Sequence, residues 1–485
     1  MSGNGEDTHA LLTDFYQLTM AYGYWKAGKS NDDAVFNLFF RRAPFRGGYV
    51  ISAGLEQVVD YIRHYSFSRR ELYYLESLQS SSRHDIFDSE FLDYLKELRL
   101  SCDIDALPEG MAAFPGEPML QVRGPLLQCQ LLESALLNIV NYQSLIATKA
   151  ARICVAARGP VVEFGLRRAP GPNGAMSASR AAYIGGCVGT SNVLAGQRFG
   201  IPVKGTHGHS WVMAFDSEAE SFDAFAAAQP DDCILLVDTY DTPAGIEHAA
   251  RVGEAMRRRG LRLAGIRLDS GDLAVLSRQA REILDRHGLI DCRIVAGNEL
   301  DEYEITRLRR AGAAIDLWGV GTRLVTGCGD SALSGVYKMS AMRSPGGDWS
   351  YKLKVTSDPD KMTCGGMPRI RRYTVNNLYW GDMIYDEQLG AGDKMILPDD
   401  TTVAIPGESS GEDLLLPIFR NGKLVYELPR LERIRERTVS ELCRLPEELL
   451  VPEPSVVYPV GRDGSCLALN RRLSMKYRSG NANPA

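Results

Sequence analysis

A repeating strand-and-helix pattern dominates the middle of the chain. Between residues 160 and 324, a short apolar run, a polar Gly-rich loop and a helical pattern follow one another six times. The runs with their loops are 160–171, 201–210, 233–245, 261–272, 292–301 and 315–324. Successive runs begin about one strand plus one helix apart, which is the size of a βα unit. The series predicts parallel strands with crossover helices, and therefore an α/β barrel or a doubly wound sheet.

The segments on either side of this series have a different pattern. Before it, helices mix with strands, and after residue 345 hairpin patterns replace the strand-and-helix alternation. The predicted elements are a helix over 8–30 with Thr8 as its cap, a strand over 34–42, helices over 54–65, 90–100 and 131–157, hairpins within 346–375 and 399–407, and a last helix over 429–445. We predict two domains, a first one over 8–125 and a second one over 126–345 that contains the strand-and-helix series, and a disordered tail over 471–485.

Composition narrows the function. A net charge of −6 and a pI near 5.8 argue against nucleic-acid binding, which requires a basic surface. The ten cysteines never form Cys-x-x-Cys, so the sequence offers neither a zinc ribbon nor a disulfide framework. The polar, acidic N-terminus does not resemble a signal peptide, and the longest apolar region, LLESALLNIV, is too short to cross a membrane. We expect a soluble cytoplasmic protein that binds neither nucleic acid nor membranes.

Polar side chains gather at the predicted carboxyl ends of the strands, where α/β folds place their chemistry. They are Arg167, Arg168, Lys204, Thr206, His207, His209, Asp238, Asp241, Arg267, Asp269, Ser270, Asp272, Asn298, Glu299, Thr322 and Arg323. An ordinary solvated set of loops would contain more Lys and Glu and less Gly. The excess of Arg, Asp and Gly favours an anionic, phosphorylated substrate together with a metal ion.

Two of these loops carry the strongest local signals. In IRLDSGDL, Arg267 ends a strand, and Asp269 or Ser270 is expected to cap a helix that runs to about His287. A capping motif alone explains neither the preceding arginine nor the two acids around a glycine. In WGVGTRLVTG, Gly319 and Gly321 permit close approach of the backbone to a phosphate.

A pair of histidines occurs in KGTHGHSWVMAF. A metal site would need further histidines at later strand ends, but His248 and His287 lie within helical patterns. His207 is therefore expected to line the loop. His209, beside Thr206, is a candidate nucleophile or acid–base group.

Taken together, these segments resemble the nicotinate phosphoribosyltransferase family. The resemblance rests on LLTDFYQLTMAYGYW at 11–25, EFGLRRAPGPNGAMSASRAAYIGG at 163–186, TSNVLAGQRFGIPVKGTHGHS at 190–210, GIRLDSGDL at 265–273, GVGTRLVT at 319–326 and GVYKMSA at 335–341. It implies a type II phosphoribosyltransferase with an irregular α/β barrel. Beside the barrel it implies a second α+β domain formed from both chain ends, so that about 346–470 completes 8–125. It also implies a homodimer with shared active sites.

The family's reaction follows from the same resemblance. Nicotinate and phosphoribosyl pyrophosphate would give nicotinate mononucleotide and pyrophosphate, with ATP hydrolysis coupled to the transfer and Mg²⁺ as cofactor. This reaction is the entry step of NAD salvage from nicotinic acid. His209 matches the histidine that ATP phosphorylates, and a shift of two residues in the alignment would give that role to His207.

The remaining roles implied by the resemblance are contacts to the two substrates. Tyr16, reaching across the dimer, and Phe164 would hold the pyridine ring, and Thr206 and Arg267 would contact nicotinate. Arg167 would contact the pyrophosphate, and the ribose phosphate would be bound by Gly319, Gly321 and Thr322. The catalytic Asp238 and Asp269 would hold ribose hydroxyls or Mg²⁺. Ser191 stands where a nicotinamide-using relative has an aspartate, which favours nicotinate because an acid would repel its carboxylate. A transferase for nicotinamide or quinolinate and a non-catalytic nucleotide-binding barrel are the alternatives.

Overall fold

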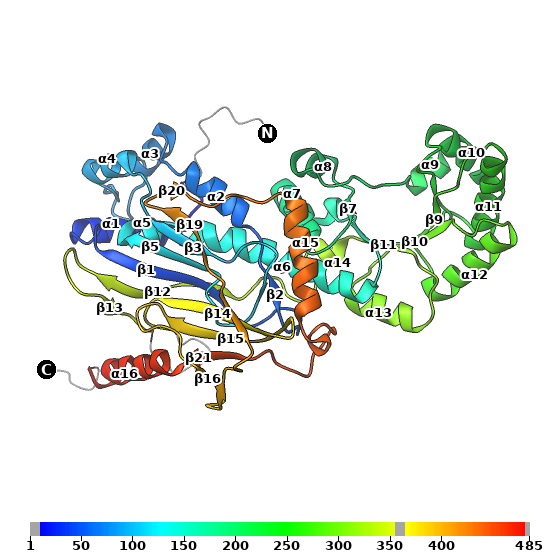
Figure 1. Cartoon of the computed structure of the whole chain (residues 1–485). Helices are drawn as coiled ribbons and strands as arrows, with labels where there is room; N and C mark the ends of the chain where they lie inside the picture. The colour runs from blue at the N-terminus through cyan, green and yellow to red at the C-terminus, as the bar shows by residue number, and fades with distance from the viewer. Residues whose placement is uncertain (1–9, 355–363, 481–485) are drawn as a thin grey trace.

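The architecture of the described residues is mixed α/β, with three large sheets and a two-stranded one. The computed structural model describes residues 10–354 and 364–480. A parallel sheet and its helices lie at one end of the molecule, and two mostly antiparallel sheets lie at the other (Figure 1). In the described part of the chain, no helix is long and apolar enough to cross a membrane.

The parallel sheet has six strands in the order β7-β6-β11-β10-β9-β8, and all neighbours run parallel. The strands are β6 (Val161–Glu163), β7 (Gly189–Thr190), β8 (Ile234–Leu236), β9 (Gly265–Leu268), β10 (Arg293–Ala296) and β11 (Leu317–Val320). They are short, and most of their residues are apolar because both faces of the sheet are covered. Ile266, Ile294 and Val320 are fully buried in its core.

Helices connect and cover these strands. They are α7 (Gly171–Ile184), α8 (Val193–Phe199), α9 (His209–Met213), α10 (Glu218–Ala228), α11 (Thr242–Arg258), α12 (Leu273–Arg286), α13 (Glu302–Arg310), α14 (Thr322–Val325) and the 3-10 turn η1 (Leu166–Arg168). The long helix α6 (Glu133–Ala157) precedes the series and packs against α7 and α13. The predicted alternation of strands and helices is therefore confirmed for five of the six units.

The exception is the run at 201–210, where the predicted strand is wrong. Only a single bridge forms there, between Thr190 and Val203, and the second strand of the series is β7 instead. Pro202 has no N–H to give to a ladder, and its carbonyl accepts one bond from Thr190 N at 3.0 Å. The chain then leaves the sheet and reaches α9.

A seven-stranded sheet combines strands from distant parts of the chain. Its order is β13 (Ser350–Tyr351), β12 (Gly335–Arg343), β1 (Asp33–Phe40), β5 (Leu120–Pro125), β3 (Asp103–Ala106), β19 (Leu416–Arg420) and β20 (Lys423–Leu424). The other elements of the N-terminal region are α1 (Phe15–Lys26), α2 (Leu55–Arg63), α3 (Arg69–Glu76), α4 (Ser89–Glu97), α5 (Leu126–Leu131) and the pair β2 (Val50–Ile51) and β4 (Ala112–Ala113). Segments after residue 345 thus share a sheet with segments before residue 126.

The first helix is shorter than predicted. α1 begins at Phe15 and ends at Lys26, with Asp14 as the N-cap residue, whereas the predicted helix spans 8–30. Thr8, its predicted cap, lies outside the described residues. The Asp14 carboxylate accepts a hydrogen bond from the Ser134 hydroxyl at 2.6 Å, which fixes the start of the helix against α6.

The third large sheet belongs to the C-terminal part. Its order is β17 (Thr402–Ala404), β16 (Lys394–Ile396), β21 (Val460–Asp463), β15 (Leu378–Asp386), β14 (Pro368–Val375) and β18 (Ser410–Asp413). This part of the chain also contains the helix α15 (Leu431–Arg444), which is followed by the 3-10 turn η3 (Glu447–Leu449). The predicted hairpin at 399–407 is confirmed by β16 and β17. The prediction that α15 is the last helix is wrong, because α16 (Gly464–Gly480) follows it. The predicted disordered tail is accordingly helical over 471–480, since buried Cys466 and Asn470 anchor α16 on the sheet.

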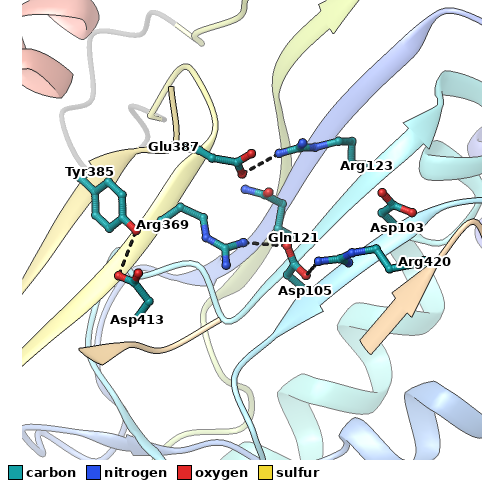
Figure 2. Close-up of a pocket in the computed structure, with 9 residues that line it drawn as sticks. All are labelled: Asp103, Asp105, Gln121, Arg123, Arg369, Tyr385, Glu387, Asp413 and Arg420. Carbon is teal, nitrogen blue, oxygen red and sulfur yellow. Dashed lines mark hydrogen bonds and ion pairs between the residues drawn. The ribbon is translucent and has the colours of Figure 1, made fainter. Parts of the chain in front are cut away.

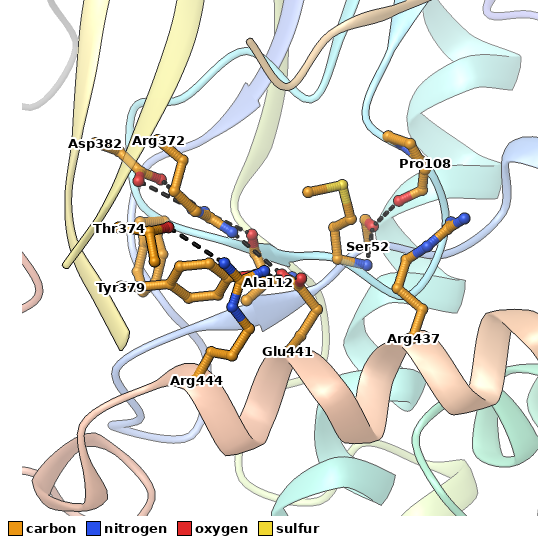
Figure 3. A network of polar contacts seen from close by, with 12 residues as sticks. Ser52, Pro108, Ala112, Arg372, Thr374, Tyr379, Asp382, Arg437, Glu441 and Arg444 are labelled. Carbon is orange, nitrogen blue, oxygen red and sulfur yellow. Dashed lines mark hydrogen bonds and ion pairs between the residues drawn. The ribbon is translucent and has the colours of Figure 1, made fainter. Parts of the chain in front are cut away.

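A buried polar network joins this sheet to α15 (Figure 3). Arg372 on β14 makes two-pronged contact with Asp382 on β15, at 2.6 and 2.9 Å, and also donates to Glu441 on α15 at 3.2 Å. The same helix also contacts the region of the parallel sheet, where Arg435 donates to the Cys187 carbonyl after α7 at 3.0 Å. α15 therefore links the C-terminal sheet to the helices around the parallel sheet.

Candidate active site

The carboxyl ends of the parallel strands bring together side chains from four separate segments. Phe164 follows β6, Asp238 follows β8, and Arg267 and Asp269 lie at the end of β9. Thr206 comes from the irregular segment before α9. Because the strands are parallel, these ends meet at one edge of the sheet, as the sequence predicts.

Arg267 is the most tightly held of these side chains. Its Nε and Nη2 donate to the two carboxylate oxygens of Asp269 at 2.8 and 2.5 Å, and its Nη1 donates to Thr206 Oγ1 at 3.0 Å. The guanidinium carbon lies 5.5 Å from the centre of the Phe164 ring. Within the described part of the chain, three of the five N–H donors are thus used for positioning, and two remain for an anion beside an aromatic face.

Asp238 is the second anchored group. Its Oδ2 accepts from the backbone N–H of Asp269 at 2.9 Å and from the Ser270 hydroxyl at 2.6 Å. The carboxylate is buried, and its Oδ1 accepts no hydrogen bond within the described chain. A buried carboxylate oxygen without a partner is costly, so this atom is suited to a substrate hydroxyl or a cation.

The caps of the neighbouring helices differ from the prediction. Asp272, not Asp269 or Ser270, caps α12, and it accepts from Ala274 N at 3.0 Å and Val275 N at 3.2 Å. Gly271, at a φ of +77°, turns the chain between the two sets of acids. Because of this turn, Asp272 caps the helix, whereas Asp269 points toward Arg267 and orients its guanidinium.

Glycines make room for the aromatic ring and the carboxylate. A Cβ on Gly319 would lie 2.7 Å from the Phe164 ring, and one on Gly321 would lie 3.2 Å from the Phe164 carbonyl oxygen. A Cβ on Gly297, directly after β10, would clash with Asp269 Oδ1. The predicted phosphate contacts of Gly319, Gly321 and Thr322 stay predictions. The geometry gives the first two glycines a packing reason that the sequence did not reveal.

Replacing Gly297 with Ala should therefore damage substrate binding without unfolding the chain. Gly297 does not have a positive φ, so alanine fits its backbone, but its methyl group must displace the Asp269 carboxylate from Arg267. Losing one charge-assisted hydrogen bond costs about 1.5–3 kcal/mol, so KM for the anionic substrate should rise roughly tenfold or more. Steady-state kinetics measure the change. Gly205→Ala is the matched control, because nothing lies within 4 Å of its added Cβ, and equal effects of the two variants would contradict the prediction.

The two histidines occupy different environments. His207 is buried, and its Nε2 accepts a hydrogen bond from Leu236 N on β8 at 3.1 Å. Its ring packs edge-on against Phe225 at 4.7 Å. Burial lowers the pKa of His207 to about 4, so the ring is neutral near pH 7 and can accept that bond. His207 covers the free edge of β8 and is held away from solvent.

His209 is exposed as the first residue of α9. Its Nδ1 lies 3.2 Å from the hydroxyl oxygen of Thr239, which follows Asp238 after β8. This contact leaves Nε2 directed away from Thr239. Of the two histidines, His209 is therefore the accessible one, and its contact joins it to the same strand ends as Asp238.

One residue that supports the site was missed in the sequence. Glu163, the last residue of β6, is buried, and its carboxylate accepts hydrogen bonds from the Ser179 hydroxyl at 2.9 Å, from Thr190 and from Gly165 N. These bonds tie β6, β7 and α7 together directly beneath Phe164. A single acid inside the apolar run PVVEF was the available signal, since a buried charge needs such partners.

Two predicted site residues do not join this group within one chain. Tyr16 is half exposed on α1, at the opposite end of the molecule from the parallel sheet (Figure 1). Arg167 lies exposed on η1, close in sequence to Phe164. In residues 10–354 and 364–480, no three His, Cys, Asp or Glu side chains form a group that could hold a metal.

A separate polar cavity of about 290 Å³ lies between the seven-stranded and C-terminal sheets (Figure 2). Its charged side chains satisfy one another. Arg369 donates to Asp105 at 2.7 Å, Arg123 donates to Glu387 at 2.8 Å, and the Tyr385 hydroxyl donates to Asp413 at 2.9 Å. Internal pairing of this kind indicates a structural joint between two sheets and not a substrate site.

An oriented arginine, an aromatic ring and a buried carboxylate at the carboxyl edge of a parallel sheet are typical of an α/β enzyme whose substrate is anionic and flat. Residues 11–141 match the nicotinate phosphoribosyltransferase N-terminal domain, residues 160–366 the nicotinate phosphoribosyltransferase family and residues 370–463 the nicotinate phosphoribosyltransferase C-terminal domain. The chain belongs to the nicotinate phosphoribosyltransferase family.

Individual relatives support this membership. The chain is 40% identical to nicotinate phosphoribosyltransferase of Bacillus subtilis, over 96% of this chain and 95% of the relative. It is 34% identical to the human protein of that name, over 90% and 91%. The crystal structure of the human enzyme matches with a TM-score of 0.83 and 32% identity, covering 95% of this chain and 99% of the other. A nicotinate-nucleotide pyrophosphorylase from Pyrococcus furiosus shares the fold, with a TM-score of 0.70 at 22% identity and coverage of 92% and 97%.

Proposed function

We propose that this enzyme transfers the phosphoribosyl group of phosphoribosyl pyrophosphate to nicotinate, giving nicotinate mononucleotide and pyrophosphate. The observation that carries the proposal is Arg267, which is oriented by Asp269 and Thr206 and has two free N–H donors beside the Phe164 ring. A guanidinium fork suits a carboxylate, and an aromatic face suits a pyridine ring. Nicotinate carries both groups. The reaction would begin NAD salvage from nicotinic acid.

The site residues have separate tasks in this reaction. Breaking the bond to pyrophosphate creates positive charge on the ribose and negative charge on the leaving group. The exposed Arg167 would stabilise the negative charge on the pyrophosphate. Asp238, through its unpaired Oδ1, would hold a ribose hydroxyl or a cation. The pyridine nitrogen needs no base, so positioning by Phe164 and Arg267 would supply most of the rate enhancement.

Mg²⁺ fits the site only as a partner of the substrate. Mg²⁺ is commonly held by one or two carboxylates together with substrate phosphates. Asp238 Oδ1 is the protein ligand that this edge of the sheet offers, whereas both oxygens of Asp269 already bind Arg267. Bound there, the metal would neutralise charge on the departing pyrophosphate.

ATP would act through His209. The exposed ring beside Thr239 can accept a phosphoryl group, which would bring about −1.5 to −2 charges to the edge of the site. Hydrolysis of this phosphohistidine would couple ATP to the transfer. His207 is the less suitable nucleophile, since it is buried and its Nε2 already accepts the Leu236 N–H.

We also infer a homodimer, in which Tyr16 of one protomer enters the site of the other. Leu12, Phe15 and Tyr16 are about half exposed around the start of α1. Such a group of apolar side chains favours a protein interface.

Strands from both chain ends share the seven-stranded sheet, which supports a second α+β domain completed by 346–470. His207 covers the β8 edge, which supports an irregular barrel over 126–345. The ten free cysteines favour the cytoplasm.

The substrate is tested by measuring product from phosphoribosyl pyrophosphate with nicotinate, nicotinamide or quinolinate, each with and without ATP. We expect turnover of nicotinate, increased by ATP. Ser191 follows β7, and its neutral hydroxyl does not repel a carboxylate. Preference for nicotinamide would overturn the choice of substrate. The absence of turnover with all three would favour the non-catalytic nucleotide-binding barrel.

A further inference from the structure

Two cysteines lie in contact far from the parallel sheet. Cys364, four residues before β14, and Cys466, near the start of α16, have their sulfurs 3.8 Å apart although they are 102 residues apart in sequence. Cys466 is fully buried, whereas Cys364 is only partly buried. A modest approach of the two sulfurs would bring them to the bonding distance of about 2.05 Å.

Asn470 holds the two cysteine segments together. Its side-chain Nδ2 donates to Cys364 Sγ at 3.4 Å and to the Cys466 carbonyl at 2.8 Å, and its Oδ1 accepts from Gly365 N at 2.8 Å. One amide, one turn further along α16 than Cys466, thus fixes the backbone at both ends of the sulfur contact. The two sulfurs meet because of this arrangement.

The environment favours a thiolate at the more accessible sulfur. A hydrogen bond from the Cys466 thiol, with help from Arg462 and the Asn470 amide, lowers the pKa of Cys364 to about 6, against burial and the charge of Asp386. The pKa of Cys466 is raised, first by its bond to Cys364 and then by burial. Near pH 7 the pair holds one proton, with the nucleophile on Cys364.

We propose that Cys364 and Cys466 form a reversible disulfide, with Cys364 as the attacking thiolate. Cys364 attacks one sulfur of a low-molecular-weight disulfide, which forms a mixed disulfide and releases one small thiolate. Cys466 then passes its proton to the released small thiolate and attacks Cys364 Sγ, which expels the second small thiolate. Two protein thiols are oxidised and one small disulfide is reduced. The product ties α16 to the segment that leads into β14.

A second pair provides an internal comparison. Cys102 and Cys129 also have sulfurs 3.8 Å apart, but both are buried in the core of the seven-stranded sheet. Burial, together with the neighbouring Cys102, raises the pKa of Cys129 well above its ordinary value. The two pairs therefore have the same distance between their sulfurs, but only the pair of Cys364 and Cys466 has an accessible thiolate. If distance alone decided oxidation, both pairs would react.

The test uses the full-length protein, oxidised glutathione and peptide mapping without reduction. We expect one disulfide per chain, between Cys364 and Cys466, with Cys102 and Cys129 still reduced. In Cys466→Ser, Cys364 should retain glutathione, and in Cys364→Ser, residue 466 should remain a free thiol. Oxidation of the wild-type chain at the Cys102 pair first would overturn the proposal.

Alkylation by iodoacetamide provides an independent measurement that needs no variant. Cys364 should react at half its maximal rate near pH 6, and the exposed Cys328 and Cys443 of the same chain provide the reference rate at each pH. Hydrogen exchange in α16 should slow after oxidation and recover after reduction by dithiothreitol. A Cys364 that reacts no faster than Cys328 at pH 7, or an α16 whose exchange is unaffected, would contradict the assignment.

Discussion

Replacing His209 with Ala should remove the stimulation by ATP completely while the slow transfer without ATP persists. The ring is exposed at the start of α9, and Thr239 engages only its Nδ1, so Nε2 is the atom expected to accept phosphate. No contact to Arg267 or Phe164 depends on it. The rates with and without ATP should become equal in the variant. Labelling with γ-³²P-ATP should give an acid-labile phosphoprotein from the wild type and none from His209→Ala.

Two further histidine variants make this result specific. His84→Ala changes an exposed histidine away from the site and should leave labelling and stimulation intact. His207→Asn should lower stability, because His207 is buried and accepts the Leu236 N–H, but the folded protein should still be labelled. Labelling that survives in His209→Ala and disappears in His207→Asn would move the phosphohistidine to His207.

The course of the chain through the parallel sheet could be predicted because its signal is local. Apolar runs such as that of β9 are short, separated by helical patterns, and need no knowledge of their partners. β7 escaped prediction because Gly189 and Thr190 form only two residues of strand, without an apolar run. α16 escaped because its anchoring residue Asn470 bonds to Gly365, more than a hundred residues away.

The site shows the same division between local and distant information. The sequence placed Arg267 and Asp269 at one strand end, and that placement is correct. It did not assign the cap of α12 to Asp272, since any of three neighbouring residues could have capped the helix. The role of Gly297 could not be predicted either, because it depends on the Asp269 carboxylate crossing from β9 to β10. The spacing of residues in the sequence predicts which of them lie at the same edge of the sheet. It does not predict which side chains they contact, because that depends on the direction of each side chain.

Arg267→Ala should lower kcat/KM for nicotinate on the order of a thousandfold. Two charge-assisted hydrogen bonds to a carboxylate contribute about 1.5–3 kcal/mol each, and a factor of ten corresponds to about 1.4 kcal/mol. The variant also leaves Asp269 without its two-pronged partner at 2.5 and 2.8 Å. Most of the loss should fall on KM for nicotinate, while KM for phosphoribosyl pyrophosphate should change little. Arg267→Lys should recover only part of the activity, because an ammonium group lacks the planar fork.

The control for this variant lies on the same sheet. Arg293 is exposed at the first residue of β10, at the opposite end of the strands from Arg267, so Arg293→Ala should leave both KM values unchanged. Thermal unfolding of both variants separates a loss of binding from a loss of fold. An Arg267→Ala enzyme with an unchanged KM for nicotinate would show that the carboxylate is bound elsewhere. The choice of nicotinate as the substrate rests mainly on Arg267. That outcome would therefore remove the main structural support for this choice, even if the enzyme still turned nicotinate over.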